Sequence, residues 1–388
     1  MKKIAFVVQR YGGEVNGGAE LECRQYAEHL KYRYDIDVLT TKAVDYITWK
    51  NEYKADEEFI NGVHVRRFPV DKPRNMKEFT RFSARVVGKN ASREEEEKWM
   101  RLQGPYSGRL LSYIRENKDE YDVFVFFTYL YATTYFGLKE VGKKSVLVPD
   151  AHDEKPIYLN IFRDMFKWAG AFFYNSYEEK IFVEKNFGVE NIPNNGGLGG
   201  VGIEIPKKVS GDAFKKKYNL DKFILYIGRI DEHKGCGELV RYFKEYKKRN
   251  ESRLKLVFMG KEFMPLEKND DIISLGFVSE QDKYDGLAAC ELLVLPSRFE
   301  SLSIVVLEAM KSKKPVLIHA GCEVVRGHCV RSGGGLYYTK YFEFEGCINY
   351  LLEHPDMAEA MGLNGEKYVD ENYEWDNLMD RFAQVIQN

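Results

Sequence analysis

The sequence predicts an α/β protein with two domains, each built on a doubly wound parallel sheet. Short apolar runs alternate with helical segments along nearly the whole chain, which is typical of parallel strands buried on both faces. A glycine-dense stretch, 194–202, interrupts this alternation near the middle, and the alternation then restarts. The length of 388 residues is enough for two or three domains.

The composition is that of a soluble globular protein, with 44% apolar and 30% charged residues. A net charge of -2 gives no reason to expect nucleic acid as a partner. The six cysteines are scattered without the Cys-x-x-Cys spacing of a zinc or redox site, so we expect reduced thiols in a cytoplasmic protein. The apolar run 4–8 is too short for a signal-peptide core, and the uncharged stretch 123–138 is too short for a membrane span.

The first domain, expected over residues 1–200, begins with a strand, a glycine-rich loop and a helix. The strand is Ile4–Val8, and the helix runs from Ala19 to Tyr32. Helical segments separate the later strands. These strands are expected at Ile36–Leu39, Val123–Phe127, Ser145–Val148 and Ala171–Tyr174.

The second domain is expected over residues 203–373, and the linker is placed where the glycine-dense stretch 194–202 leads into 203–206. Its strands are predicted at Phe223–Ile227, Leu254–Met259, Ile272–Leu275, Leu292–Leu295 and Pro315–Ile318, and two of its helices at Gly237–Arg249 and Ile304–Lys313. The tail at 377–387 is amphipathic, and we assign 374–388 to a helix that packs back on the first domain. Parallel sheets bind ligands at the carboxyl ends of their strands, so two such domains facing across a cleft would place the active site between them.

Two loops at predicted strand ends have the residues for binding an anion. The loop 11–20 has four glycines and leads into a helix, whose first backbone amides can approach a phosphate closely. An ordinary loop without a ligand is the alternative. The loop 228–235 directly follows a strand and carries Arg229 and Lys234, which can hold a diphosphate through a guanidinium fork and an ammonium charge. Two solvated surface cations are the alternative there.

The most specific pattern is the segment 299–308, which follows the strand Leu292–Leu295. Ser303 is placed to cap a helix that starts at Ile304. Glu308 falls in an apolar part of this helix, where an unpaired carboxylate would be costly unless it accepts hydrogen bonds, for instance from the hydroxyls of a ligand. A pair of salt-bridged glutamates, Glu300 and Glu308, is the structural alternative.

Together these motifs resemble the retaining nucleotide-sugar glycosyltransferases of the GT-B fold, family 4. The resemblance rests on Glu300-x7-Glu308, on the pair Arg229 and Lys234, on the loop Asn16-Gly17-Gly18 and on the two-domain pattern. This chain has Ser301 where the family commonly has glycine. The resemblance implies transfer of a hexose from a nucleotide diphosphate sugar to a hydroxyl of a glycan or lipid-linked acceptor, with retention at the anomeric carbon, in the synthesis of a cell-surface polysaccharide or glycoconjugate.

The resemblance also implies a role for each site residue. Arg229 and Lys234 would bind the diphosphate and stabilise it as the leaving group. Glu300 and the amides near Leu302 and Ser303 would hold the transferred sugar, and Glu308 would bind the ribose. The remaining implied contacts are Phe277 and Val278 near the base, Gly17 and Gly18 over the phosphates from the other domain, and His152 beside the sugar.

A satisfied structural histidine is the alternative for His152. No cofactor and no metal are expected, because the nucleotide sugar is a substrate and the two cations replace a divalent ion. Asp35 and Asp37 match the metal-binding Asp-x-Asp of another glycosyltransferase fold, but they open an early strand, which explains both. The glycines 197, 199 and 202 satisfy a dinucleotide fingerprint but lead into Ile203–Pro206 instead of a helix, so we interpret them as linker.

A basic segment is the one strong local charge feature. Residues 64–93 hold nine Lys+Arg and two Asp+Glu, and Lys77, Arg81, Arg85 and Lys89 recur at four-residue intervals. On a helix these four side chains share one face. The face is either a solvated surface or a contact with an anionic target, which would be a phosphate-bearing acceptor or the inner membrane surface.

Other functions remain open from the sequence. A nucleotide-sugar epimerase or a sugar phosphorylase could share this architecture, although a phosphorylase needs a lysine for pyridoxal phosphate and no clear one is present. An NAD-dependent oxidoreductase would need an acidic residue at the end of the second strand, where the chain has Thr40-Thr41-Lys42. An inactive glycan-binding subunit would lack the phosphate-binding residues.

Overall fold

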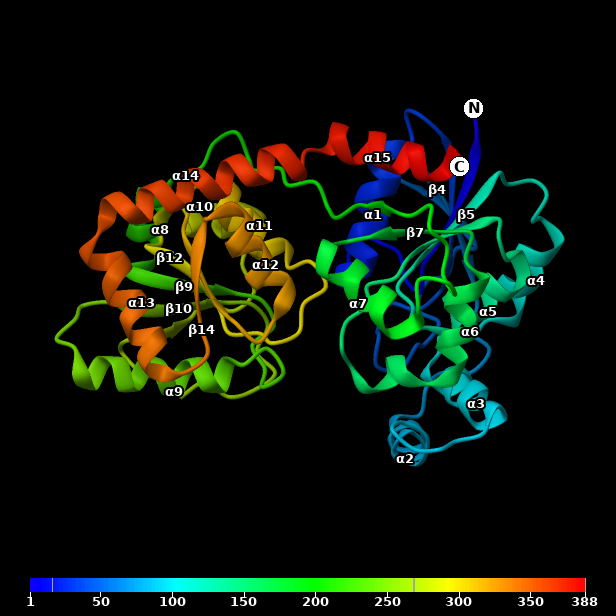
Figure 1. Ribbon diagram of the computed structural model, residues 1–388, viewed down its shortest axis with the longest axis horizontal. Helices are drawn as coiled ribbons and strands as arrows, with labels where there is room; N and C mark the ends of the chain where they lie inside the picture. The colour runs from blue at the N-terminus through cyan, green and yellow to red at the C-terminus, as the bar shows by residue number, and fades with distance from the viewer. Residues whose placement is uncertain (16, 268, 388) are drawn as a thin grey trace. The chain divides into compact units, whose positions relative to one another are not determined.

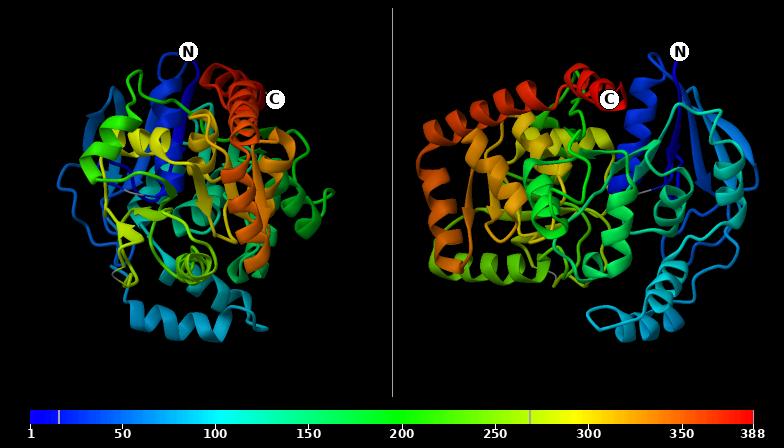
Figure 2. Two further views of the ribbon diagram at one scale, coloured as in Figure 1. Left: turned by 90° about the vertical axis from the view of Figure 1, so that its left-hand side faces the viewer. Right: turned by 45° about the vertical axis from the view of Figure 1, so that its right-hand side comes forward.

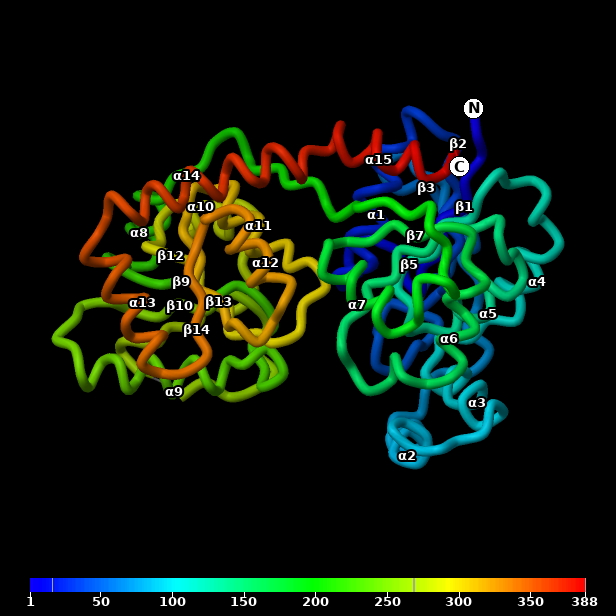
Figure 3. The backbone as a smooth tube through the Cα atoms, in the orientation of Figure 1, coloured from blue at the N-terminus to red at the C-terminus, as the bar shows by residue number. Residues whose placement is uncertain are grey.

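The structure, a computed structural model, describes residues 1–15, 17–267 and 269–387 and divides into two compact units (Figure 1). Unit 2 spans Gly202–Asn377, and unit 1 holds the described residues on either side of it. The chain leaves unit 1 after Val201 and returns to it within the C-terminal segment, where α14 (Pro355–Asn372) is followed by α15 (Trp375–Gln387) (Figure 3). Each unit contains its own predominantly or wholly parallel sheet, which confirms the predicted fold class.

Eight strands form the sheet of unit 1, in the order β3-β4-β2-β1-β5-β6-β7-β8. Neighbouring strands are parallel except for β3 and β4. The central strands are buried along their length, which explains why they read as continuous apolar runs. The strands are β1 (Lys3–Val7), β2 (Asp35–Thr41), β3 (Glu57–Ile60), β4 (Val63–Phe68), β5 (Val123–Phe127), β6 (Ser145–Val148), β7 (Ala171–Tyr174) and β8 (Gly197–Leu198).

Among the described residues of unit 1, four helices start at a residue whose side chain caps the helix, namely α2, α3, α4 and α7. Asn75 accepts hydrogen bonds from the amides of Lys77 and Glu78 at the start of α2, and Ser92 and Glu95 form a capping box at the start of α3. A short 3-10 helix spans Lys155–Tyr158. The α-helices are α1 (Gly18–Leu30), α2 (Met76–Val86), α3 (Arg93–Gln103), α4 (Gly108–Glu116), α5 (Ala132–Val141), α6 (Asn160–Trp168) and α7 (Tyr177–Phe187), with α15 added by the C-terminal segment.

Helix α2 forms an outer layer of unit 1 (Figure 2). It packs on α3, and α3 in turn packs on α5 and α6. Aromatic rings connect these layers, since Phe79 of α2 lies 6.0 Å from Trp99 of α3, and Trp99 lies 6.5 Å from Phe162 of α6. One face of α2 is therefore held by packing, and the opposite face is left to solvent.

Helix α15 packs on the sheet of unit 1, as the sequence predicts for the C-terminal helix. The ring of Phe382 lies 6.2 Å from Phe6 of β1, 5.7 Å from Tyr26 of α1 and 5.3 Å from Phe173 of β7. Phe382 is buried among these rings. The segment therefore adds a helix to a core that is otherwise formed by residues before Val201.

The hairpin β3–β4 is an element that the sequence analysis does not anticipate. Asn61 and Gly62 connect the two strands, and both have positive φ, at 50° and 80°. Two such residues form the tight turn that matches the twist of a hairpin, and Asn-Gly is its preferred sequence. The hairpin extends the sheet beyond β2, because β4 pairs with β2 in parallel.

Six parallel strands form the sheet of unit 2, in the order β11-β10-β9-β12-β13-β14. The strands are β9 (Phe223–Ile227), β10 (Lys255–Met259), β11 (Ile272–Ser274), β12 (Leu292–Leu295), β13 (Val316–His319) and β14 (Gly335–Tyr338). The helices are α8 (Gly211–Tyr218), α9 (Cys236–Arg249), α10 (Glu280–Ala289), α11 (Ile304–Lys311), α12 (Glu323–Ser332), α13 (Tyr341–Glu353) and α14. β9 and β12 are neighbours, so the loops that follow them emerge side by side.

The predicted linker does contain the boundary between the units, at Val201 and Gly202, but its glycine-dense stretch is packed. Gly197 and Leu198 form the edge strand β8, which pairs with β7 in parallel. A side chain at Gly199 would overlap the ring of Phe173, and one at Gly202 would overlap the ring of Trp375. These glycines allow the backbone to lie directly against aromatic rings, and a nucleotide is not needed to explain them.

Candidate active site

The loop after β9 is organised by Asp231. Its Oδ2 accepts a hydrogen bond from Arg229 Nε at 2.8 Å, and its Oδ1 accepts one from the backbone amide of Lys234 at 2.8 Å. Gly235 ends the loop with φ of 75°, and a Cβ there would lie 2.8 Å from the carbonyl oxygen of Pro296. Only glycine lets the start of α9 approach the loop after β12 this closely.

Lys234 and Glu300 meet across the two neighbouring loops. Lys234 Nζ lies 2.7 Å from Glu300 Oε1, and the two side chains are 29% and 12% exposed. The contact follows from the sheet order, because the carboxyl ends of adjacent parallel strands meet at one edge. Arg229 is half-exposed on the same loop as Lys234, with its guanidinium held by Asp231. A cation and a carboxylate are thus fixed together, with a second cation on the same loop.

Ser303 does not cap α11, although the helix starts at Ile304 as predicted. Its φ of 65° is left-handed, and its hydroxyl makes no capping hydrogen bond. The Ser303 Oγ is buried without any hydrogen-bond partner among the described residues. The reason is backbone conformation, because an N-cap residue normally has extended dihedrals that direct its side chain at the first turn. The start of α11 thus has a buried polar group that no described residue satisfies.

His328 of α12 contacts the loop that precedes α11, and sequence reasoning did not identify this residue. The imidazole is fully buried, with Nε2 3.0 Å from the carbonyl oxygen of Leu302 and Nδ1 3.0 Å from the hydroxyl of Tyr368. A carbonyl only accepts, so Nε2 carries the proton and Nδ1 accepts from the tyrosine. Leu302 is itself buried. The conformation of the loop is therefore fixed by an interaction with a distant helix.

Glu308 has partners within the chain, so its carboxylate is not left unpaired. Lys283 Nζ and the Tyr284 hydroxyl, both from α10, lie 2.7 and 2.9 Å from the same oxygen, Glu308 Oε1. Burial raises the pKa of Glu308, and Lys283 and Tyr284 act in the opposite direction.

Phe277 and Val278 lie in the loop after β11, where Phe277 is 80% exposed and Val278 is half-buried.

The loop after β1 carries an internal ion pair beside the two glycines of interest. Arg10 and Glu20 are both buried, with Arg10 Nη2 2.6 Å from Glu20 Oε1. A Cβ at Gly17 would overlap the Glu20 carboxylate, whereas Gly18 has open space around it. α1 begins at Gly18, and Gly17 provides no side-chain cap. Asn16, which belongs to the same motif, lies outside the described residues.

His152 follows β6, and its side chain is one-third exposed. Its Nδ1 lies 3.3 Å from the carbonyl oxygen of Asp150, and its Nε2 lies 3.7 Å from Glu154 Oε1. Glu154 also accepts a hydrogen bond from the hydroxyl of Tyr129. The histidine is therefore held near a carboxylate at the carboxyl end of a strand, with part of its ring open to solvent.

A cluster of buried carboxyl groups adjoins the segment that carries His152, and the sequence analysis missed it. Glu22, Asp150 and Glu179 are its carboxyl groups, and Asn175 Nδ2 donates to Glu22 at 3.1 Å and to Asp150 at 2.8 Å. Glu179 accepts from the amides of Ala151 and Asn175. Burial raises the pKa of all three carboxyl groups, and that of Asp150 reaches about 7. Carboxylates so far apart in sequence give no local signal of their meeting.

The basic face of α2 is shorter than predicted. Lys77, Arg81 and Arg85 lie on α2 and are exposed, but the helix ends at Val86 and Lys89 follows it in a turn. Val87 has extended dihedrals and Gly88 has φ of 72°, so the helical spacing cannot continue to Lys89. Arg85 pairs with Glu95 at 3.3 Å. Among the residues that the structure describes, Lys77 and Arg81 have no ion-pair partner.

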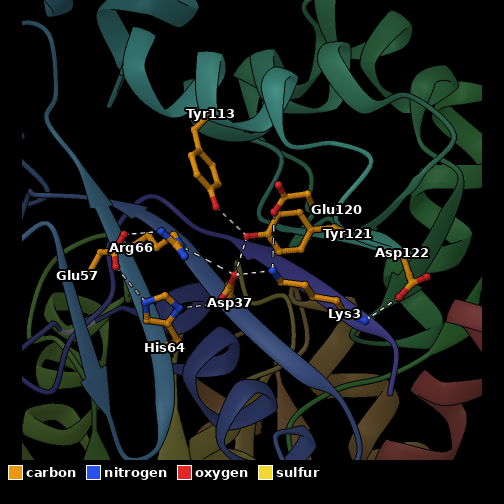
Figure 4. A network of polar contacts seen from close by, with 9 residues as sticks. All are labelled: Lys3, Asp37, Glu57, His64, Arg66, Tyr113, Glu120, Tyr121 and Asp122. Atoms are coloured by element: carbon orange, nitrogen blue, oxygen red, sulfur yellow. Dashed lines mark hydrogen bonds and ion pairs between the residues drawn. The ribbon is translucent and has the colours of Figure 1, made fainter.

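Asp37 belongs to a polar network that stabilises unit 1 (Figure 4). Its Oδ1 lies 2.7 Å from His64 Nδ1, and its Oδ2 accepts from the hydroxyl of Tyr121 at 2.6 Å and faces Lys3 Nζ at 3.8 Å. Asp35 is exposed at the start of β2. With Arg66 Nε at 3.9 Å from Oδ2 as a fourth partner, the Asp-x-Asp pattern is explained by a buried, well-partnered carboxylate and a surface residue.

Comparison with known proteins gives a family match within unit 2 and solved structures that share the fold of the chain. Residues 211–368 match the family described as glycosyl transferases group 1. An uncharacterized glycosyltransferase of Methanocaldococcus jannaschii is 24% identical, and the match covers 99% of this chain and 98% of that protein.

Two solved structures have the same fold over the whole chain. Sucrose-phosphate synthase from Thermosynechococcus elongatus matches with a TM-score of 0.73 at 14% identity, covering 100% of this chain and 98% of that one. The Anabaena protein HepE, in complex with UDP and glucose, matches with a TM-score of 0.69 at 15% identity, covering all of both chains. These similarities establish the GT-B architecture.

By length and apolar content, every described helix falls short of what crossing a membrane requires.

Proposed function

We propose that this chain, a glycosyltransferase of the GT-B fold with a glycosyl transferases group 1 domain at residues 211–368, transfers a hexose from a nucleotide diphosphate sugar to a hydroxyl of a glycan or lipid-linked acceptor, with retention at the anomeric carbon. The observation that carries the proposal is the contact between Lys234 and Glu300, at 2.7 Å, beside Arg229. Arg229 and Lys234 would then bind a diphosphate, and Glu300 beside them would accept hydrogen bonds from sugar hydroxyls.

Unit 2 would bind the donor. Arg229 and Lys234 would take the diphosphate oxygens and stabilise the negative charge that grows as the sugar departs, which lowers the barrier without a protein nucleophile. Glu300 would accept hydrogen bonds from the hydroxyls of the transferred sugar. The amides at the start of α11, near Leu302 and Ser303, and the free Ser303 hydroxyl would complete this part of the donor site.

The remaining donor contacts are assigned by residue type and place. Glu308, whose pKa Lys283 lowers against the effect of burial, would accept from the ribose hydroxyls. Phe277 and Val278 would contact the base, since an exposed aromatic ring is suited to stacking on one. In unit 1, Gly17 and Gly18 would contribute to phosphate binding and His152 to sugar binding. No metal or cofactor takes part in this scheme, because the two cations neutralise the diphosphate.

The acceptor would carry negative charge or lie at a negatively charged surface. Lys77, Arg81 and Arg85 project from the solvent-facing side of α2, while Phe79 on the other side packs against Trp99. A phosphate-bearing lipid-linked acceptor or the anionic inner leaflet would meet this face, at about 1 kcal/mol for each basic residue near the surface. A cytoplasmic protein bound peripherally to the membrane satisfies both conditions.

Thermal unfolding with a panel of nucleoside diphosphates tests the donor assignment. UDP, GDP, ADP and TDP are compared, and UDP comes first because the structural neighbour HepE was solved with UDP. A ligand at 100 times its dissociation constant stabilises the folded state by about 2.7 kcal/mol. We expect one diphosphate to raise the unfolding temperature of the wild type and to lose most of that effect in Lys234→Met.

The matched control is Lys217→Met on α8. Lys217 also pairs with a carboxylate, that of Asp282, at 2.7 Å, but it lies outside the proposed donor site. This control should respond to the diphosphate like the wild type. An unchanged unfolding temperature with every nucleotide, or an equal response in Lys234→Met and the wild type, would show that the donor site is assigned wrongly.

A further inference from the structure

We propose that Lys283 and Tyr284 of α10 are positioning residues, which hold Glu308 through one carboxylate oxygen and leave the other to the ribose of the donor. The inference rests on the proposed function, in which Glu308 binds the ribose. It adds two residues that do not belong to the sequence motif, and it assigns separate roles to the two oxygens of Glu308.

The contacts to Glu308 Oε1 support separate roles for the two oxygens of this carboxylate. Lys283 Nζ and the Tyr284 hydroxyl both approach Glu308 Oε1, at 2.7 and 2.9 Å. Glu308 is 8% exposed, so its rotation is restricted by packing within α11 and by these two donors. Two donors on one oxygen define the plane of the carboxylate. Oε2 then remains as the acceptor for two adjacent hydroxyls.

Lys283 is the dominant of the two donors. A tyrosine hydroxyl has one proton, and that of Tyr284 lies within hydrogen-bond distance of both Glu308 Oε1 and the carbonyl oxygen of Glu204, each at 2.9 Å. The bond to a carboxylate is charge-assisted and therefore stronger, but the hydroxyl can change partners. The ammonium of Lys283 has three protons and serves Glu308 and Glu280 at once, at 2.7 Å each.

The charges around Glu308 determine how readily its carboxyl group ionises. Burial raises the pKa of Glu308, and Glu280 adds to that effect, while Lys283 and Tyr284 lower it. Lys283 itself stays charged, because its two carboxylate neighbours raise the pKa of its ammonium despite burial. Without Lys283, this buried carboxylate would lose the cation that most strongly offsets its burial. It would then hold a proton over a wider pH range and would accept only weaker, uncharged hydrogen bonds from the ribose.

A purely structural salt bridge is the alternative reading of this contact. Lys283 and Glu308 connect α10 with α11, and a bridge of that kind would affect stability alone. The two readings differ in what they predict for the ribose. A positioning role changes the preference between ribose and deoxyribose nucleotides and makes that preference depend on pH, whereas a structural role lowers stability and leaves the preference unchanged.

The experiment measures binding of one nucleoside diphosphate and of its 2′-deoxy and 3′-deoxy forms between pH 6 and pH 8.5. The variants are Lys283→Met, Lys283→Arg and Tyr284→Phe, with Lys217→Met as the matched control, and the base is the one that binds the wild type best. A hydrogen bond to a charged group corresponds to about a tenfold or larger difference in affinity. We therefore expect the wild type and the control to prefer the ribose form at least about tenfold.

The variants should separate the two donors. Lys283→Met is expected to reduce the ribose preference to about threefold or less at pH 6 and to recover part of it toward pH 8.5, because the ionised fraction of Glu308 rises with pH. Lys283→Arg restores the charge and should restore the preference. Tyr284→Phe should show a smaller loss, because Lys283 remains.

Each remaining outcome decides against the inference. If Lys283→Met keeps the full preference at every pH, or loses affinity equally for all three nucleotides, Lys283 is only a structural residue. If the wild type binds the diphosphate without any ribose preference, Glu308 does not bind the ribose and the inference fails while the proposed donor class stands. If the wild type binds no nucleoside diphosphate, the proposed function itself fails, and the inference fails with it.

Discussion

Replacing Asp150 with asparagine tests the buried acidic cluster of unit 1. Asp150 follows β6, faces Glu22 and accepts a hydrogen bond from Asn175 Nδ2 at 2.8 Å. Its φ of 52° is left-handed, and asparagine is one of the few residues that tolerate this region. The substitution therefore keeps the shape, the backbone conformation and the hydrogen bond from Asn175, and it removes the ability to ionise.

The magnitude follows from the pKa of Asp150. Burial, and next the charge of Glu20, raise it from 3.8 to about 7. Between these values the folded state binds more protons than the unfolded state, so this group makes the protein less stable as the pH rises from about 4 to about 7. The full difference corresponds to at most roughly 4 kcal/mol. The asparagine variant cannot ionise at this position and does not lose this stability. Its free energy of unfolding, relative to that of the wild type, should therefore rise by about 2 to 4 kcal/mol between pH 4.5 and pH 8.

Urea unfolding followed by tryptophan fluorescence suits the measurement. Trp49, Trp99 and Trp168 lie in unit 1, and only Trp375 of the four tryptophans lies in unit 2, so the signal reports mainly on unit 1. The control is Asp153→Asn, which removes an exposed carboxylate from the same segment. The reasoning is refuted if the difference between Asp150→Asn and the wild type is the same at pH 4.5 and at pH 8.

The other predictions concern the donor and the acceptor. Glu308→Ala should weaken donor binding, whereas Glu300→Ala should mainly slow transfer, as measured by KM and kcat with the same donor; wild-type values in both variants would contradict the assignment. Activity should persist in EDTA, because protein cations neutralise the diphosphate; complete loss with recovery on adding Mn²⁺ would show a metal requirement. Reversing the charge of Arg81 and Arg85 should lower transfer to the native acceptor without changing donor binding, and the difference should shrink with added salt, which screens exposed charges beyond about 8 Å at physiological ionic strength. A normal transfer rate at low salt would mean that this face of α2 is only solvated.

The parallel strands could be predicted from sequence because burial on both faces makes them continuous apolar runs. The predicted bounds at 123–127, 145–148, 223–227 and 292–295 agree with β5, β6, β9 and β12. The hairpin β3–β4 was missed because its strands are short, carry several charges and have one exposed side. The turn Asn61-Gly62 was the signal that could have identified it.

The candidate site was predictable where it depends on strand order and not where it depends on distant packing. Lys234 and Glu300 follow strands that prove to be neighbours, so their meeting follows from the topology. The partners of Glu308 come from α10, and the support of Leu302 comes from His328 on α12, which no local pattern indicates. Ser303 has a left-handed backbone that the capping pattern does not reveal, so this pattern alone led to the wrong prediction.

The most direct test of the proposed function is the slow hydrolysis of the nucleotide sugar in the absence of acceptor, followed by proton NMR. Water then takes the place of the acceptor, so the configuration of the first sugar released reports the stereochemistry of the reaction. We predict that this sugar has the same anomeric configuration as in the donor, and that Lys234→Met releases it far more slowly. Release of the opposite anomer, or an equal rate in Lys234→Met and the wild type, would contradict the proposed retaining transfer from a donor bound by Lys234.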